Sequence, residues 1–220
     1  MNNSNPTFNT GANDGLPPHA FAAMSLTNDG SSIVAIGGMT SSCSSDGLVH
    51  TLDLAGNGTW EKVSPSGVIR RRGAQMAWVD NGSTDGEMML VGGIADTFSC
   101  GKCSLFLRKF LTVPASSTSS YPATDILSLP MSSSSLVSTR ILPTFLTGSE
   151  LAVSDFAMTS DPNGTIYLAG GQAANGDMVS LATIGMWTKT AGWISQVTTG
   201  DIPAARIGAS LEAHPSLDIL

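Results

Sequence analysis

The sequence is poor in charged residues, and its net charge is negative. Asp, Glu, Lys and Arg make up 12% of its 220 residues, about half of the ~25% that is usual in soluble domains. The formal net charge is -7, and Lys and Arg together number only 10. Because nucleic-acid binding depends on dense positive charge, the composition predicts no nucleic-acid partner.

Long hydrophobic runs are also missing. No run approaches the ~18 apolar residues of a membrane-spanning helix, so no membrane span is expected in this portion. Residues 1–15 are polar and rich in Asn; they lack the basic segment and apolar core of a secretory signal and are expected to be disordered. Triplets at Asn2, Asn57, Asn81 and Asn163 fit glycosylation acceptors, but Asn-Gly is also a common hairpin turn. Extracellular and cytoplasmic locations are therefore both left open.

Cysteine is scarce. Cys43, Cys100 and Cys103 are the three cysteines, and an odd number leaves at least one unpaired, which argues against a disulfide scaffold. Cys100 and Cys103 have the spacing of a redox or zinc motif. Neither a βαβ pattern nor two further ligands accompanies them, so a local disulfide or free loop thiols are the favoured interpretation.

Glycine, by contrast, is abundant, with 24 residues. An apolar run that ends in two glycines occurs three times, at 33–38, 88–93 and 166–171. Three copies of such a run predict a repeated supersecondary unit. In the first and third copies a tryptophan, Trp60 or Trp193, follows the second glycine by the same 22 residues.

Each unit is expected to contain four short antiparallel strands. A long segment, 94–122, precedes the third strand of the second unit, and 104–113 is an alternative position for that strand. The expected strands are 20–26, 33–38, 48–54 and 59–63 in the first unit, 73–79, 88–93, 124–129 and 136–141 in the second, and 152–159, 165–171, 178–187 and 193–197 in the third. Arg-x-Gly-Ala or a similar sequence opens the second unit at 71–74 and a fourth at 206–209.

These residues resemble the kelch repeat, in which an apolar strand closes in Gly-Gly and a tryptophan and Arg-x-Gly-Ala follow. The resemblance implies an all-β fold, a partial β-propeller of four-stranded antiparallel blades. It divides the chain into the disordered segment 1–15, blade one at 16–67, blade two at 68–148 with its insertion at about 94–122, blade three at 149–203 and the start of a fourth at 204–220. Known propellers close with ~4 to 8 blades, so we expect a fragment, a truncated gene model or an open array.

The motif residues are assigned structural roles. No helix signal or phosphate-loop spacing follows the glycine pairs, so close backbone packing near the propeller axis is favoured. The tryptophans are expected to pack between blades, each burying ~150 to 250 Å². The residues of the repeat motif are Gly37, Gly38, Trp60, Gly92, Gly93, Gly170, Gly171 and Trp193.

Four arginines, Arg70, Arg71, Arg72 and Arg206, precede the first strands of the second and fourth units. In the family this position lies near one loop face, so the four form a candidate interaction surface that would grip an acidic peptide by bidentate hydrogen bonds. The alternative is that each arginine makes a local structural bond between blades. We favour this alternative, because a lone cluster of charges is weak evidence for a binding surface.

The function expected from the resemblance is a non-catalytic scaffold that binds a protein or peptide partner through its loops. Those loops are 39–47, 94–122 and 172–177. The alternative is the propeller part of a secreted or membrane-anchored copper radical oxidase or carbohydrate-binding protein, with its active residues beyond Leu220. The copper constellation is not apparent, because the only tyrosines are Tyr121 and Tyr167.

No cofactor or metal is expected. The three histidines are isolated from one another and from acidic partners in the sequence, which makes a His-based metal or catalytic site a weak hypothesis. They are His19, His50 and His214.

Overall fold

The structure is a computed structural model, and the described part of the chain is built from strands alone. It contains fourteen strands and no helix, which confirms the expected all-β class. In the described ranges no helix is therefore long and apolar enough to cross a bilayer. The described residues are 19–27, 29–40, 49–54, 58–63, 70–79, 87–94, 126–130, 140–141, 154–173 and 175–213.

The first sheet has the order β2-β3-β5-β6, with every neighbouring pair antiparallel. Its strands are β2 (Ala23–Leu26), β3 (Ser32–Ile36), β5 (Val49–Asp53) and β6 (Trp60–Val63). A further two-stranded ladder joins β1 (His19–Ala20) to β4 (Met39–Thr40). The strand expected at 20–26 is thus interrupted, because Phe21 has a φ of 58°.

The turn between β2 and β3 is organised by one carboxylate. Asp29 accepts hydrogen bonds from the Ser31 amide at 3.0 Å, the Thr27 hydroxyl at 2.7 Å and the Ser31 hydroxyl at 2.8 Å. Such side-chain bonds to nearby residues are how Asp stabilises turns. Bonds to the ionised form hold the pKa of Asp29 below its usual value, with the Ser31 amide as the largest cause.

The second sheet has the order β10-β9-β8-β7. Its strands are β7 (Gln75–Val79), β8 (Glu87–Val91), β9 (Ile126–Pro130) and β10 (Arg140–Ile141). The third strand is therefore the one expected at 124–129, and β9 pairs antiparallel with β8. The alternative segment, 104–113, lies outside the described residues.

The third sheet has the order β11-β12-β13-β14. Its strands are β11 (Ala157–Ser160), β12 (Ile166–Ala169), β13 (Thr183–Thr188) and β14 (Gly192–Val197). Residues 198–213, which include most of the expected start of a fourth unit, contain no strand. The rest of that unit, 214–220, lies outside the described part.

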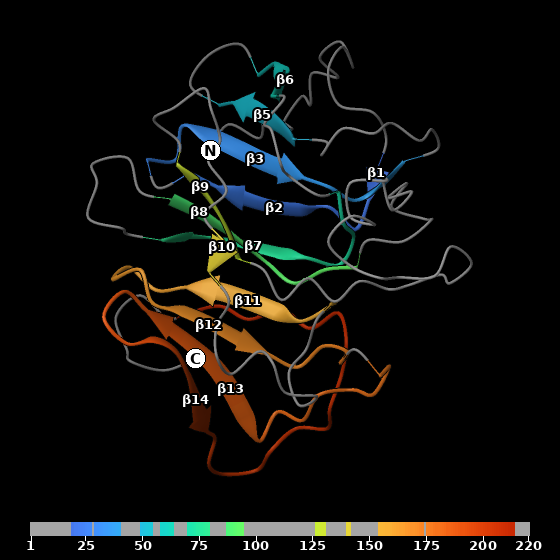
Figure 1. Cartoon of the computed structure of the whole chain (residues 1–220), viewed down its shortest axis with the longest axis vertical. Coiled ribbons are helices and arrows are strands. Elements are labelled where there is room, and N and C mark those ends of the chain that lie inside the picture. The colour runs from blue at the N-terminus through green and yellow to red at the C-terminus, as the bar shows by residue number, and fades with distance from the viewer. Residues whose placement is uncertain are drawn as a thin grey trace, which may run out of the picture.

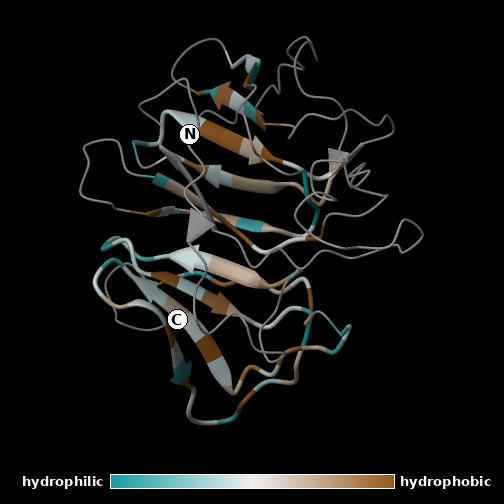
Figure 2. Cartoon of the chain, in the orientation of Figure 1, coloured by the Kyte–Doolittle hydropathy of each residue, from teal (hydrophilic) through white to brown (hydrophobic). Residues whose placement is uncertain are grey.

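The three sheets form an open stack (Figure 1). Their first strands, β2, β7 and β11, lie side by side, and β6 and β14 lie at opposite ends of the molecule. Hydrophobic residues colour β3 along most of its length (Figure 2). The strands β7 and β8 of the middle sheet contribute to a core cluster on each side.

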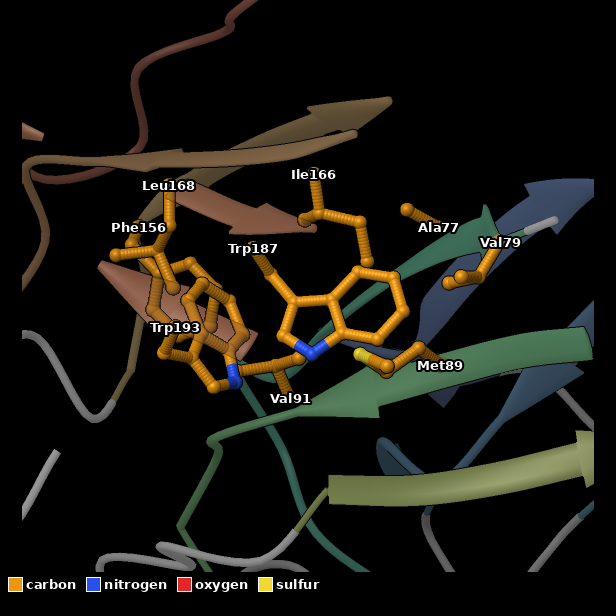
Figure 3. Close-up of a cluster of buried hydrophobic side chains, with 9 residues drawn as sticks. All are labelled: Ala77, Val79, Met89, Val91, Phe156, Ile166, Leu168, Trp187 and Trp193. Carbon is orange, nitrogen blue, oxygen red and sulfur yellow. The ribbon is translucent and has the colours of Figure 1, made fainter. Parts of the chain in front are cut away.

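Alternation along β7 and β8 explains why the middle sheet can be buried on both sides. Met76 and Met88 pack in a cluster with Val34, Ile36 and Val49 of the first sheet. The residues next to them point to the opposite face, since successive side chains of a strand alternate. These neighbouring residues of β7 and β8 pack against the third sheet in a second cluster. Figure 3 shows its members: Ala77, Val79, Met89, Val91, Phe156, Ile166, Leu168, Trp187 and Trp193.

Candidate functional site

The first and third glycine pairs lie where the backbone that opens the next unit crosses. A Cβ on Gly37 would overlap the carbonyl oxygen of Arg71, and a Cβ on Gly38 would lie 2.8 Å from the carbonyl oxygen of Ala20. The amide of Gly38 donates to the Arg71 carbonyl at 2.7 Å, and the amide of Gly171 donates to the Arg206 carbonyl at 2.9 Å. All six glycines of the three pairs have positive φ, between 64° and 93°.

A second contact repeats along the stack at four residues in left-handed conformation. Phe21, Gly73, Asp155 and Gly208 have φ values of 58°, 66°, 56° and 65°. Each amide donates to the carbonyl of the residue before it in this series, at 3.1 Å for Gly73, 2.9 Å for Asp155 and 3.0 Å for Gly208. The same bond therefore links every unit to the next.

Sequence reasoning missed two members of this series. Positive φ is rare outside glycine, so Phe21 and Asp155 carried no signal in their residue type. Their positions did carry one, because each lies two residues before a first strand, β2 or β11, as Gly73 lies two residues before β7. Asp155 also explains why β11 starts at Ala157 and not at the expected residue 152.

The arginine cluster does not form one exposed surface. Arg70 and Arg71 are only 4% and 1% exposed, and their side chains donate to backbone carbonyls. Arg70 Nε bonds the Gly38 oxygen at 3.0 Å, and Arg71 Nη1 bonds the Gly92 oxygen at 2.8 Å. Only Arg206, which is exposed, and Arg72, which is half-buried, present surface to solvent.

The two tryptophans differ in their surroundings. Trp193 is 8% exposed and pairs across strands with Trp187, and Figure 3 shows these two rings against Met89 and Val91 of the middle sheet. Trp60 holds the corresponding place opposite Leu52 in the first sheet and is half-buried, because no described sheet covers that face.

Comparison with known proteins finds a likeness only among solved structures. No family model and no curated protein matches the chain. Of the solved structures, 68 chains match, and one of these is YjhT, with a TM-score of 0.55 at 17% sequence identity. The match covers 87% of this chain and 55% of YjhT, so the chain spans about half the length of YjhT. At this identity the likeness concerns the fold alone.

Because neighbouring strands are antiparallel, the connections between strands lie alternately at the two ends of each sheet. The turns that join first to second strands, such as 161–165, lie at one end. The connections from second to third strands, 172–182 in the third sheet, lie at the other end, with the segments that lead into the next unit, such as 198–206. Of the expected binding loops 39–47 and 94–122, only residues 39, 40 and 94 are described; they follow second strands and lie at this second end.

The remaining loop, which we call the 172–178 hairpin, is held rigidly by its own hydrogen bonds (Ala174 lies outside the described residues). Gln172 and Met178 form an isolated antiparallel β-bridge, and the side-chain amide of Gln172 donates to the Gly176 carbonyl at 2.8 Å. Asn175 Nδ2 donates to Asp177 Oδ2 at 2.7 Å, and the Asp177 amide donates to Asn175 Oδ1 at 3.0 Å.

The hairpin is tied to the third sheet at Gln172, and Met178 at its other end is exposed. Gln172 exchanges backbone bonds with Ser154, at 2.9 and 3.3 Å, which ties it to the segment before β11. Met178 is 58% exposed. The expected strand 178–187 is thus shorter in the structure, because Met178 turns back to pair with Gln172.

Tyr167 and His50 are the other candidate residues whose surroundings the structure describes. Tyr167 donates a long hydrogen bond of 3.4 Å to Asp161, within a turn, and His50 is buried at 1% exposure. No group of three or more His, Cys, Asp or Glu that could hold a metal occurs among the described residues. Cys43, Cys100, Cys103, Tyr121 and His214 lie outside them.

Proposed function

We propose that the three sheets are blades of a kelch-type β-propeller and that the chain is a non-catalytic scaffold for a protein or peptide partner. The propeller interpretation is supported by the repeated contact between units. The same backbone bond joins each unit to the next, and the glycine contact recurs at Gly38–Arg71 and at Gly171–Arg206. Units joined by the same bond are related by nearly the same rotation, as in repeat architectures.

The observation that carries the binding role is the 172–178 hairpin. It is pre-organised by internal hydrogen bonds, so a partner would lose little loop entropy on binding. It presents an exposed apolar side chain, Met178, beside the polar groups of Asn175 and Asp177. Methionine is a common contact residue at adaptable binding surfaces, and rigid scaffolds concentrate recognition in such loops.

The test is a peptide-display selection on the immobilised protein, followed by mapping of the enriched peptides by amide chemical shifts. Met178→Ser is expected to weaken their binding by roughly tenfold, the effect of losing about 1.4 kcal/mol of apolar contact. Leu54→Ser is the matched control, because Leu54 is also exposed, at 46%, but lies in a turn at the opposite end of the sheets.

Two results would contradict the binding role. One is a set of enriched peptides whose shift changes fall away from residues 172–178. The other is equal binding to the wild-type protein and to Met178→Ser.

A further inference from the structure

The four Asn-Gly dipeptides of the chain divide between the two ends of the sheets. Those at Asn57, Asn81 and Asn163 are followed by Ser or Thr, whereas the one at Asn175 is followed by Asp. The first three belong to connections from a first to a second strand or from a third to a fourth, which share one end; β2 and β11 point toward it in Figure 1. Asn175 belongs to the other end, which carries the 172–178 hairpin. Asn57 and Asn81 lie outside the described residues, so Asn163 is the one to compare with Asn175.

The turn that carries Asn163 is held by Asp161. The Asp161 carbonyl accepts a hydrogen bond from the Gly164 amide at 3.0 Å. Its carboxylate accepts from the amides of Asn163 and Thr165 at 2.9 and 2.8 Å. With Asp161 first, Pro162 second and Gly164 fourth, the residues are typical of a type I turn, which is compatible with most residues at its third position. The turn therefore does not require an asparagine at 163.

The backbone of Asn163 does not require an asparagine either. An Asn-Gly hairpin turn of type I′ needs positive φ at both residues. Gly164 has a φ of 77°, but Phe21 and Asp155 are the only described residues other than glycine with positive φ. The preference for Asn-Gly in hairpin turns thus explains Gly164 and leaves Asn163 unexplained.

Asn163 and Asn175 also differ in what their side chains bond. Asn175 Nδ2 donates to Asp177 Oδ2, and its Oδ1 accepts from the Asp177 amide, so Asn175 has a structural role. Asn163 is exposed, and neither its side-chain amide nor the Thr165 hydroxyl is hydrogen-bonded to any described residue. The turn thus presents to solvent an asparagine without a structural role, two residues before a threonine.

We propose that Asn163 is a modification site, the acceptor of an N-linked oligosaccharide. Asn163, Gly164 and Thr165 form the acceptor pattern, and the donor is an oligosaccharide carried on a lipid diphosphate. Asn163 Nδ2 forms a bond to the anomeric carbon of the first sugar and gives up one proton to water. The bond from that carbon to the diphosphate oxygen breaks, and the diphosphate leaves with the electron pair.

The glycan would stand at the end of the sheets away from the 172–178 hairpin. Glycans are bulky and solubilising and occupy surfaces, and this position leaves the hairpin uncovered. The modification site shares no residue with the hairpin, so it does not depend on the proposed function.

The test isolates the protein from the cells that naturally produce it and treats it with peptide N-glycosidase in water labelled with heavy oxygen. The enzyme converts a glycosylated asparagine to aspartate and leaves a labelled oxygen on it, which mass spectrometry of the fragments locates. Labelled aspartate is expected at position 163 and not at Asn175. Asn-Gly also loses its amide spontaneously, so a sample without the enzyme is the control.

Variants separate glycosylation from a structural role of the asparagine. In the producing cells, Thr165→Ala should abolish the label and Thr165→Ser should keep it, because serine also completes the acceptor pattern. In protein made without glycans, Asn163→Ala should leave the melting temperature unchanged. Asn175→Ala, the matched control, should lower it through the loss of its two bonds to Asp177.

Four results would overturn the inference. They are an unmodified Asn163 in the protein from its natural source, equal labelling with and without the enzyme, a label that survives Thr165→Ala, and a melting temperature that falls as much for Asn163→Ala as for Asn175→Ala. The last result would mean that the turn itself requires the asparagine.

Discussion

Replacing Arg71 by alanine tests how much the buried arginine side chain stabilises the second sheet. The substitution leaves the buried Gly92 carbonyl without the donor that lies 2.8 Å away, which costs about 1–3 kcal/mol. It also removes two buried methylene groups beyond Cβ, the Cγ and Cδ that face Gly93, at about 0.8 kcal/mol each. Relief from burying the guanidinium charge offsets part of this loss, so we expect the free energy of unfolding to fall by about 3 kcal/mol.

That loss is readily measured by urea unfolding, and as a lower melting temperature. For a chain of this size 1 kcal/mol corresponds to about 2–4 °C, so Arg71→Ala should lower the melting temperature by roughly 6–12 °C. Arg71→Met keeps much of the stem and removes the donor. It should therefore lose only the hydrogen-bond part, about 1–3 kcal/mol.

Arg206→Ala is the matched control, because the backbone at Arg206 makes the same contact while the side chain is exposed. Its unfolding free energy should stay within about 0.5 kcal/mol of wild type. Equal losses for the two alanine variants would refute the reasoning. A loss below about 1 kcal/mol for Arg71→Ala would refute it as well, since the unsatisfied carbonyl alone should cost that much.

Three further outcomes follow from the packing and from one turn. In urea unfolding, Trp193→Ala should lower the free energy of unfolding by about 3–5 kcal/mol. Trp60→Ala should lower it clearly less, because Trp193 is 8% exposed whereas Trp60 is half-buried. Similar losses for the two variants would contradict the inter-sheet role of Trp193. Gly93→Ala should cost more unfolding free energy than Gly30→Ala, since both have positive φ but only Gly93 has atoms at 2.8 Å from an added Cβ; an equal cost would leave backbone strain as the whole effect. An NMR titration should place the pKa of Asp29 below that of an ordinary aspartate. The stabilising effect of the Asp29 carboxylate is therefore present above the ordinary pKa and is lost as the pH falls through the lowered pKa of the folded state. A titration midpoint at the ordinary aspartate pKa would mean that the turn bonds do not form.

The apolar runs predicted the second strands closely, since β3, β8 and β12 lie at the three Gly-Gly repeats, whereas the first strands were less predictable. Left-handed residues interrupt the chain at Phe21 and Asp155, and neither residue type announces such a conformation. Met178 was expected to start a strand, but hydrogen bonds within the 172–178 hairpin compete for it.

The candidate site shows a sharper division between what is local and what is not. The sequence by itself determined that the chain is a series of antiparallel strand units, because alternation, turn residues and glycine pairs are local patterns with local causes. It treated Arg71 and Arg206 alike, since both belong to the same motif. Only the tertiary structure decided that one is buried and the other exposed. Burial of a side chain depends on whether a strand from elsewhere in the chain lies beside it, as β8 does beside β7.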